Sequence, residues 1–524
     1  MNIESEKRLF VLTEDTKTIG RALLPEVPID KLGIDTYLSA VSSVLTEALL
    51  DYCIDTKTFK EEIIDSALSA RVQQLLDSDP DTICICLDRF LLSTIENNEN
   101  YADRFARFSI TRTSDGQKVP RIQSPSFEEQ LQTFEQKFSE IPNRSFVIVD
   151  DGVFSGGTML DVITTYLSKI NIKKQQCTVV GFIGNSGQKT LEDQNIRTEI
   201  LNAIPNLYDW IDLRDLGVFG GKLNSTNNTD TRFSSPYLYP WSDGKGASFD
   251  KFENFFDISS SLINAQIGLF LSWESMRSKE ITFADLTNAG FPLPNDEKQT
   301  ITISPDTRVV DYLKSCDTRI QQEKQRDVVV FDMDGTLYQL DGENNGYKGS
   351  LLEEKVLQNA QIYIQNLLNC NTDEAQKVLD VGLQDPVGLS AYLSAKYGVT
   401  RKQYFDAVWN IDPNGILQNF DIPVQTIKDI QKTDKKLVLL TSAPKIWQAQ
   451  VTDYLGITEA FESIYTAEDF QTKKDIFGML TKRYLPGNIL SVGDQKKTDI
   501  TPADELGCKT FLVASPRDLE RISL

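Results

Sequence analysis

The sequence predicts an α/β protein built from two Rossmann-like domains, each with a parallel sheet. Two short apolar runs, at residues 146–151 and 328–332, end in aspartates and lead into glycine-containing turns. Such runs are typical of parallel strands that are buried on both faces and present polar residues at their carboxyl ends. Amphipathic helical patterns alternate with these and similar runs, as a parallel α/β fold requires.

The remaining elements follow from the same two patterns. Apolar runs predict further strands at 82–87, 178–183, 437–440, 488–492 and 510–513, and helical periodicity predicts helices at, for example, 36–52, 127–138 and 351–368. Between roughly 200 and 300 the chain is rich in Asn, Ser, Thr and Gly, which favours long loops or an irregular hood. We expect a first domain at 1–295 with its hood at about 200–290, a linker at 296–326 and a second domain at 327–524.

Composition excludes several classes of function. The 54 basic and 76 acidic side chains give a formal charge of −22, which repels nucleic-acid backbones and anionic membranes. No stretch approaches the roughly 20 apolar residues of a membrane helix, and the first residues are too charged for a signal peptide. We therefore expect a cytoplasmic protein with no nucleic-acid or membrane partner. The sequence is compatible with a homodimer but does not specify the number of subunits.

The chain contains no histidine. This excludes Ser-His-Asp and Cys-His catalysis and zinc sites with histidine ligands. Any chemistry must therefore depend on carboxylates, lysines, hydroxyl groups and metal ions.

The C-terminal strand–aspartate element predicts a metal site. Asp332 and Asp334 lie two residues apart at the end of a strand, so both point to the same side of an extended chain. Two carboxylates this close repel each other unless a cation or a proton lies between them. Mg²⁺ is the natural solution, because it prefers oxygen ligands and also binds phosphate.

The segment DMDGT resembles the opening motif of the haloacid dehalogenase superfamily, and further motifs follow in the family's order. Thr441 ends the strand of LVLLTSAP, and Lys473 or Lys474 begins the helix of TKKDIFGML. Asp494 and Asp499 follow a third strand in NILSVGDQKKTDI. The resemblance covers about residues 327–524.

This resemblance implies a magnesium-dependent phosphatase. Asp332 would attack phosphorus to form an aspartyl-phosphate, and Asp334 would act as acid and base. Thr441 would hold the transferred phosphoryl group, and Lys473 or Lys474 would neutralise it. The acids of the implied metal site are Asp332, Asp334, Asp494 and Asp499, together with the Met333 carbonyl. Asp334 favours a phosphatase, because dehalogenases of the family lack this second aspartate.

The helical stretch between Asp334 and Thr441 has the size of a cap domain, which we place at about 343–425. AVWNIDPNGIL and the Leu-Tyr pair after DGT resemble pyrimidine 5′-nucleotidase-like members of the family. This similarity indicates a nucleotide or sugar phosphate as the substrate. Trp409 and Tyr338 are candidates to stack on a base, although simple packing is the more frequent role of such residues.

The N-terminal strand–aspartate element predicts a phosphate site. Asp150 and Asp151 end a strand, a glycine-rich loop follows, and Thr158 opens a helix. Free amides at a helix start can bind a phosphate, and Gly156 and Gly157 let the backbone approach it closely.

The segment DDGVFSGGT resembles the signature of type I phosphoribosyltransferases. By this resemblance, the two acids would bind the ribose of phosphoribosyl pyrophosphate (PRPP). The residues implied to bind its 5′-phosphate are Ser155, Gly156, Gly157 and Thr158.

Other parts of this domain supply further candidates. Asp88 and Arg89 follow a strand where the family places its pyrophosphate loop. The segment 107–122 could be the mobile loop that closes over the donor, with Arg112, Lys118 and Arg121 supplying positive charge. A solvated hairpin is an equally good interpretation of this segment.

Together the two resemblances imply a bifunctional enzyme of nucleotide or nucleoside metabolism. The first domain would join a base to ribose 5-phosphate from PRPP, and the second would remove a phosphate with Mg²⁺. One alternative is a phosphatase whose N-terminal domain only senses PRPP or nucleotides. A second alternative is a non-enzymatic scaffold.

Overall fold

The computed structural model describes residues 8–14, 16–50, 52, 54–88, 91–112, 118–121, 124–138, 144–219, 222–223, 233–234, 237–241, 252, 254–289, 303–385 and 388–522. The chain divides into two compact units, Met1–Ile320 and Gln321–Leu524. Helix α10 (Val309–Lys324) lies within the stretch expected as a linker and spans this division. None of the helices described is both long and apolar enough to cross a membrane.

The second unit is built on a five-stranded parallel sheet in the order β15-β14-β13-β16-β17. Its strands are β13 (Val328–Phe331), β14 (Lys436–Leu440), β15 (Ser463–Tyr465), β16 (Ile489–Gly493) and β17 (Lys509–Leu512). The central strand β13 is fully buried, which explains its uninterrupted apolar sequence. The chain runs outward from β13 to β15 and then returns to β16, so the strand order reverses at β13. Ligands bind at the carboxyl ends of strands at such a point.

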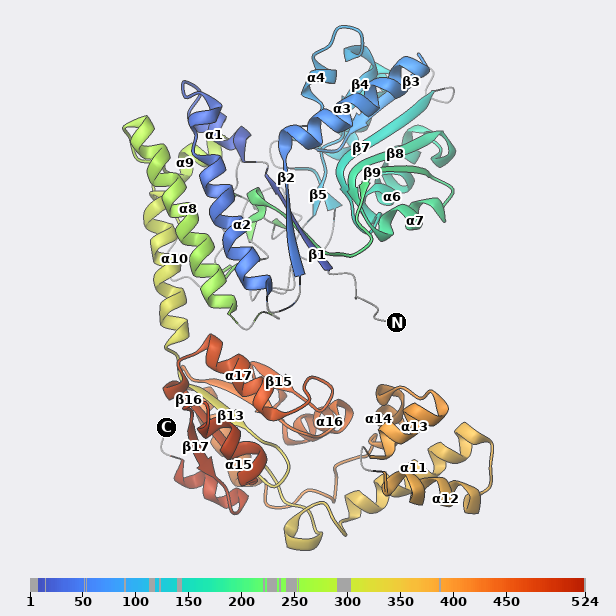
Figure 1. The fold of residues 1–524 in the computed structure, drawn as a ribbon, viewed down its shortest axis with the longest axis vertical. Helices are drawn as coiled ribbons and strands as arrows, with labels where there is room; N and C mark the ends of the chain where they lie inside the picture. The colour runs from blue at the N-terminus through green and yellow to red at the C-terminus, as the bar shows by residue number, and fades with distance from the viewer. Residues whose placement is uncertain are drawn as a thin grey trace. The chain divides into compact units, whose positions relative to one another are not determined.

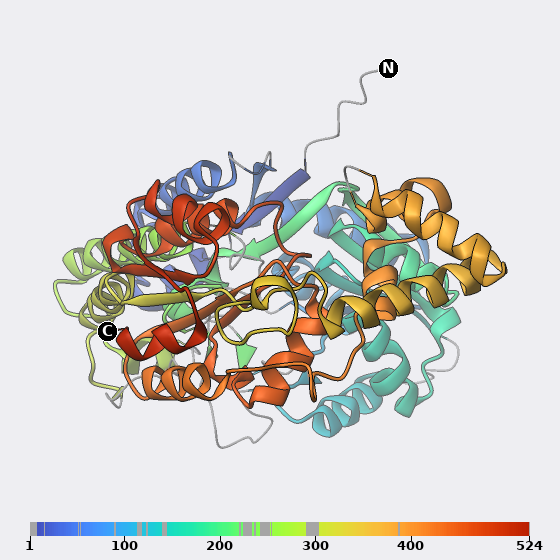
Figure 2. The same ribbon diagram turned by 90° about the horizontal axis from the view of Figure 1, so that it is seen from below.

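Helices cover this sheet and form a cap inserted between β13 and β14. The cap contains α11 (Leu351–Leu368), α12 (Thr372–Leu383), α13 (Leu389–Tyr397) and α14 (Arg401–Val408). The helices of the sheet layer are α15 (Asp421–Gln431), α16 (Lys445–Leu455), α17 (Lys473–Arg483) and α18 (Thr501–Asp504). The gold-to-orange cap helices extend to one side of the sheet in both views (Figure 1 and Figure 2).

The first unit contains a second five-stranded parallel sheet, in the order β4-β3-β7-β8-β9. Its strands are β3 (Thr82–Cys86), β4 (Phe105–Arg107), β7 (Ser145–Val153), β8 (Cys177–Gly184) and β9 (Arg197–Ala203). The order reverses between β3 and β7, so residues after these two strands lie at the position expected for a ligand. Helix α3 (Glu61–Ser78) follows β2 (Ile54–Lys60), and α4 (Ser93–Glu96) follows β3. Helix α5 (Phe127–Lys137) precedes β7, α6 (Gly157–Asp161) follows β7, and α7 (Ser186–Glu192) follows β8.

A second sheet in the first unit was not predicted. Strands β10 (Leu207–Asp212), β1 (Arg8–Glu14) and β2 (Ile54–Lys60) pair in parallel in this order. Nearby are α1 (Lys17–Leu23), α2 (Ile34–Leu50), α8 (Phe255–Arg277) and α9 (Phe283–Asn288), and Figure 1 shows α2 beside α8. Short antiparallel pairs join β5 (Thr111–Arg112) to β6 (Lys118–Val119) and β11 (Lys222–Leu223) to β12 (Phe233–Ser234).

The composition of residues 200–290 predicted long loops or irregular structure, whereas the described part of this segment contains regular elements. Strand β10 joins a sheet, and α8 is a 23-residue helix. Helix α8 buries residues on several of its faces, including Phe256, Leu262 and Trp273, so its sequence lacks the single apolar stripe that identifies an amphipathic helix. The polar run at 224–232 lies outside the described residues.

Candidate active site

The end of β13 places two aspartates at the centre of the second unit. The amide of Asp332 donates to the carbonyl of Val492 on β16 over 2.9 Å, so the strand pairing continues to the aspartate itself. The Asp332 side chain is buried, at 6% exposed, and its Oδ2 atom accepts a hydrogen bond of 3.3 Å from the Thr336 hydroxyl. Asp334 lines a pocket next to this position. The backbone therefore fixes both carboxylates at the reversal of the strand order.

A buried lysine lies between two of the predicted acids. The Lys473 Nζ atom is 2.5 Å from Oδ1 of Asp332 and 2.8 Å from Oδ1 of Asp499. Lys473 is the first residue of α17, where the helix dipole disfavours positive charge, so these two carboxylates hold it in place. Lys474 instead forms an exposed ion pair with Glu505 over 2.7 Å. Of the two predicted lysines, Lys473 alone contacts the nucleophile candidate.

Three carboxylates meet at distances suited to a metal ion. Oxygen atoms of Asp332, Asp494 and Asp499 all lie within 4.8 Å of one another. The Oδ1 atom of Asp494 is buried and has no hydrogen-bond partner among the described residues. Gly335 has φ = +81°, and a Cβ atom there would lie 2.4 Å from Oδ2 of Asp494, so only glycine allows this approach. A buried oxygen without a donor is the arrangement expected of a cation ligand.

Burial governs the protonation of this cluster. It raises the pKa of Asp332 to about 8 and that of Asp494 to about 6, and it also raises the pKa of Asp334. Burial opposes the charge of Lys473, but the adjacent Asp332 and Asp499 outweigh it and raise the pKa of the ammonium group. Four carboxyl groups around one ammonium group therefore resist full ionisation unless further positive charge is supplied.

A buried network that the sequence did not reveal holds Asp334. The Tyr338 hydroxyl donates to Oδ1 of Asp334 and accepts a 3.1 Å hydrogen bond from the Trp447 indole. The Thr441 hydroxyl donates to Oδ2 of Asp334 over 3.3 Å and accepts from the amide of Ala443 over 3.0 Å. Tyr338 is 0% exposed, so its suggested role in stacking on a base is wrong.

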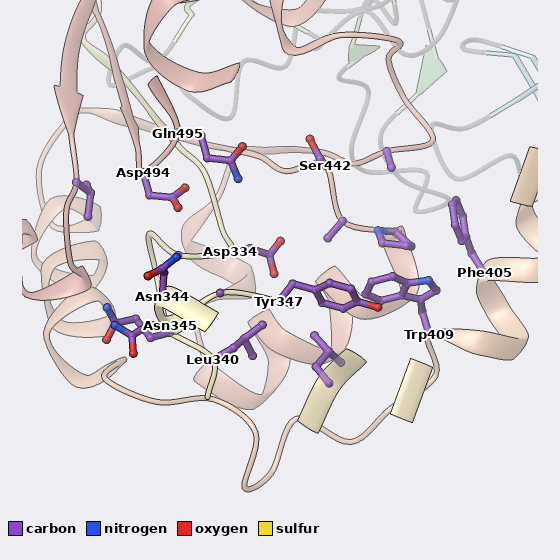
Figure 3. A pocket seen from close by; sticks show the side chains of 18 of the residues that line it. Asp334, Leu340, Asn344, Asn345, Tyr347, Phe405, Trp409, Ser442, Asp494 and Gln495 are labelled. Carbon is purple, nitrogen blue, oxygen red and sulfur yellow. The ribbon is translucent and has the colours of Figure 1, made fainter. Parts of the chain in front are cut away.

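A cavity of about 530 Å³ opens next to these acids (Figure 3). Its core side includes Asp334, Asp494, Gln495 and Ser442, and its cap side includes Arg401, Phe405 and Trp409. Tyr347, in the loop before α11, also lines it and stacks on Trp409 with ring centroids 5.8 Å apart. The sequence indicated Trp409 as a candidate. It did not indicate Tyr347, because no strand or helix pattern leads into Tyr347.

The first unit has its own pocket, of about 390 Å³, at the end of β7. Most of the predicted PRPP residues line it, namely Asp150, Asp151, Ser155, Gly156 and Thr158; Gly157 begins α6 next to them. Gly156 has φ = +74°, and a Cβ there would lie 2.8 Å from the Gly187 carbonyl oxygen. Further lining residues that the sequence did not single out are Asp209, Trp210, Asp212, Asp215 and Tyr237.

This second pocket is strongly acidic. Its lining includes five aspartates and, among the described residues, no lysine or arginine. Burial raises the pKa of Asp150 to about 6 and also raises that of Asp151. The run LYDWIDLRD contains the further aspartates of this pocket. Its alternation of acids with aromatic and aliphatic residues is the sequence signal from which they could have been found.

Of the other N-terminal candidates, Asp88, Lys118 and Arg121 do not line this pocket. Asp88 is buried and accepts hydrogen bonds from the amide of Leu91 over 2.8 Å and from Arg214 over 3.3 Å. Lys118 forms an ion pair with Asp161 on α6, and Arg121 donates to the carbonyl of Ile110 over 2.9 Å. Arg89 and the side chain of Arg112 lie outside the described residues. Within the segment 107–122, Thr111–Arg112 and Lys118–Val119 pair as two short antiparallel strands.

Comparisons with known proteins find one matching family model and several similar solved structures. Three solved structures resemble the chain: a HAD-type hydrolase from Bacillus subtilis bound to magnesium, a haloacid dehalogenase-like family hydrolase from Xanthomonas campestris, and a haloacid dehalogenase-like family protein from Streptococcus pneumoniae. The first is 20% identical, with 36% of this chain and 87% of its own covered and a TM-score of 0.23.

The second structure is 15% identical, with 36% and 83% of the two chains covered and a TM-score of 0.23. The third is 18% identical, with 37% and 90% covered and a TM-score of 0.22. No curated protein matches the chain. Residues 329–513 match the family model of haloacid dehalogenase-like hydrolases. The C-terminal part of the chain is therefore a haloacid dehalogenase-like hydrolase domain.

Proposed function

We propose that the second unit hydrolyses small phosphomonoesters with Mg²⁺, through a covalent aspartyl-phosphate on Asp332. The observation that carries this proposal is the buried contact of 2.5 Å between Lys473 Nζ and Asp332 Oδ1 within a group of carboxylates. A lysine held against a nucleophilic carboxylate can offset the negative charge of an incoming phosphoryl group. This arrangement would serve little purpose in a site that binds only neutral ligands.

The donor atoms suit a magnesium ion. Asp332, Asp494 and Asp499 offer oxygen atoms within 4.8 Å of one another, and the buried Oδ1 atom of Asp494 has no hydrogen-bond donor among the described residues. Hard divalent cations prefer such oxygen ligands. When bound, Mg²⁺ would neutralise charge on the phosphoryl group during transfer.

The residues can carry out both halves of the reaction. An Asp332 oxygen attacks phosphorus, the bond from phosphorus to the leaving oxygen breaks, and Asp334 gives that oxygen a proton. Asp334 then takes a proton from the attacking water, and the bond between Asp332 and phosphorus breaks to release inorganic phosphate. The Thr441 hydroxyl, which donates to Oδ2 of Asp334 over 3.3 Å, would turn its hydrogen to the transferred group during the reaction.

The first prediction tests the nucleophile. Asp332→Asn removes the attacking carboxylate while keeping its size, so Mg²⁺-dependent phosphate release should fall by at least about 1,000-fold. Release of inorganic phosphate from a panel of phosphomonoesters measures this. Full activity in the variant would rule out the covalent mechanism.

The second prediction uses the two adjacent lysines as a matched pair. Lys473→Gln should lower kcat by about 100-fold or more, because a buried positive charge next to the nucleophile is lost. Lys474→Gln should change kcat by less than about 2-fold, because its ion pair with Glu505 is exposed. Steady-state kinetics on both variants gives the comparison, and similar losses in the two would contradict the assignment.

The third prediction concerns pH. The folded-state pKa values of Asp332 and Asp494, about 8 and about 6, lie above the usual value of 3.8, so their contribution to stability is present at low pH and is lost as pH rises through 6 to 8. Mg²⁺ binds the ionised carboxylates. The ion should therefore raise the melting temperature more at pH 8 than at pH 5.5.

Thermal melts with Mg²⁺ and with a chelator at both pH values measure this difference. Asp494→Asn should reduce it, because the variant has one ionisable ligand fewer. An equal rise in melting temperature at the two pH values would show that the ion does not bind at these carboxylates.

We propose a second function, binding of PRPP, for the pocket of the first unit. The supporting observation is that Asp150, Asp151 and the Ser155–Thr158 loop, which resemble the phosphoribosyltransferase signature, face one cavity of about 390 Å³. Because this lining carries five aspartates, a pyrophosphate group would have to enter together with divalent cations. Transfer to a base would make the chain bifunctional, whereas binding without transfer would make the first unit a sensor.

The fourth prediction tests this pocket in the Asp332→Asn background, so that the second unit does not consume the ligand. Calorimetry should show saturable PRPP binding that requires Mg²⁺, and Asp151→Asn should weaken it by about 10-fold or more. Asp81→Asn, a change in an exposed acid paired with Arg144, is the control. Absence of binding would reject the proposal, and a pyrophosphate-release assay over a panel of bases separates transfer from sensing.

A further inference from the structure

The two carboxylate oxygens of Asp334 have different surroundings. The Tyr338 hydroxyl contacts Oδ1, whereas the Thr441 hydroxyl donates to Oδ2 over 3.3 Å. Thr441 directly precedes Ser442, which lines the cavity together with Asp334 (Figure 3). Tyr338 and its partner Trp447 are 0% exposed and do not line the cavity. Oδ2 therefore lies on the side of the cavity, and Oδ1 lies on the side of the buried core.

A tight turn brings Tyr338 back to Asp334. The amide of Gly335 donates to the Tyr338 carbonyl over 3.1 Å, and the amide of Leu337 donates to the Met333 carbonyl over 2.9 Å. Gly335 has φ = +81°, a conformation that glycine adopts readily. The turn places the Tyr338 hydroxyl against the acid that lies four positions earlier in the chain.

The segment after β14 supplies the second member of this network. The chain leaves β14 at Thr441 and enters α16, whose third residue is Trp447. The Trp447 indole donates to the Tyr338 hydroxyl oxygen over 3.1 Å. A buried indole N–H requires an acceptor, and the indole group cannot itself accept a hydrogen bond in return. The Tyr338 oxygen is therefore an acceptor towards Trp447.

This arrangement decides where the Tyr338 hydrogen points. Because its oxygen accepts from Trp447, Tyr338 satisfies its own O–H group by donating to Oδ1 of Asp334. If the Asp334 carboxyl group donated instead, the Tyr338 hydrogen would have no acceptor among the described residues, and a buried donor without an acceptor is costly. Oδ1 is therefore an acceptor, and the proton that Asp334 carries as an acid belongs on Oδ2.

We propose that Tyr338 and Trp447 are positioning residues that make Oδ2 the oxygen of Asp334 through which protons pass to and from the substrate. The Oδ2–H group gives its hydrogen to the leaving oxygen as the bond from phosphorus to that oxygen breaks, and Oδ2 later takes a hydrogen from the attacking water. This inference rests on the proposed hydrolysis at Asp332. In the competing interpretation the pair only packs the core, and its loss affects all substrates equally.

The test uses two substrates that differ in their need for a proton. The leaving oxygen of an alkyl phosphate has to be protonated, whereas para-nitrophenolate is stable enough to leave without a proton. With the full-length protein and Mg²⁺, Tyr338→Phe should lower kcat/KM for ribose 5-phosphate by about 10-fold or more. The same variant should lower kcat/KM for para-nitrophenyl phosphate by less than about 3-fold, because Asp332 and Lys473 are unchanged.

Tyr312→Phe is the matched control. Tyr312 lies in the first unit, is 4% exposed and accepts a 2.7 Å hydrogen bond from the Trp241 indole, so this variant removes a similar buried pair away from the cavity. Its kcat/KM should be unchanged for both substrates. Trp447→Phe should show a weaker form of the Tyr338→Phe pattern, because the Tyr338 hydroxyl remains but is no longer oriented. Equal losses for the two substrates in Tyr338→Phe, or no loss, would overturn the inference.

Inorganic phosphate labelled with heavy oxygen gives a test that does not depend on the identity of the substrate. In the reverse of the second half reaction, Asp332 attacks phosphorus, Asp334 protonates the departing oxygen, and that oxygen leaves as water. Attack by unlabelled water then returns phosphate with one labelled oxygen fewer. Mass spectrometry measures this exchange, which Tyr338→Phe should slow by about 10-fold or more.

The outcomes separate the inference from the function on which it rests. Exchange that Asp332→Asn abolishes but Tyr338→Phe leaves intact would support the covalent mechanism and overturn the positioning role. Neither exchange nor hydrolysis by the unaltered protein would reject both. Mg²⁺ should raise the melting temperature of Tyr338→Phe as much as that of the unaltered protein. Loss of this rise would show that the variant disturbs the metal site, and the positioning role would then be rejected.

Discussion

The second unit depends on how negative charge is held at the end of β13. Four carboxyl groups, those of Asp332, Asp334, Asp494 and Asp499, surround one ammonium group, that of Lys473. Burial strengthens every charge interaction in such a site and makes each unpaired charge costly. A phosphate dianion would add to this excess, so the site as built would repel it without an accompanying cation. Under the proposed function, a bound divalent ion would offset this excess of negative charge.

Sheet topology brings these groups together from distant parts of the sequence. Asp332 follows the central strand, Thr441 follows β14, and Asp494 follows β16. Parallel pairing places the carboxyl ends of all three strands along one edge of the sheet. The hydrogen bond from the Asp332 amide to Val492 extends the pairing by one residue and so fixes the nucleophile candidate relative to the strand that carries Asp494. The first unit uses the same principle, because its pocket lies beside the reversal between β3 and β7.

Much of this arrangement was predictable because short-range patterns encode it. Each predicted strand of the second unit lies within about two residues of an observed one, and Asp332, Thr441 and Asp494 follow directly after β13, β14 and β16. The choice between Lys473 and Lys474 could not be made from sequence. Neighbouring side chains on a helix point about 100° apart, so only the orientation of α17 decides which one meets Asp332.

The residues that prediction missed act through tertiary contacts. Tyr338 and Trp447 are 109 positions apart, and their hydrogen bond has no local signature. Tyr347 lies in a loop, and its role in the cavity depends on a ring supplied by α14. In the first unit, β1 and β10 pair across nearly 200 positions, so the three-stranded sheet could not be inferred from the runs themselves. Strand β2 has the sequence IDTKTFK, in which Ile54 and Phe59 are the only apolar residues, so no alternating pattern marked it as a strand.

The turn after Asp334 has a consequence for how such a domain loses its activity. Gly335 has no side chain, and its contribution to the site is the space that it leaves for the Asp494 carboxylate. One additional carbon atom at this position would displace a carboxylate while every acid, hydroxyl group and lysine of the site remained in the sequence. A chain with every motif residue intact could therefore be inert, and an inventory of reactive side chains alone would not detect it. To judge whether this site is intact, one must check that position 335 carries no Cβ atom as well as that the reactive side chains are present.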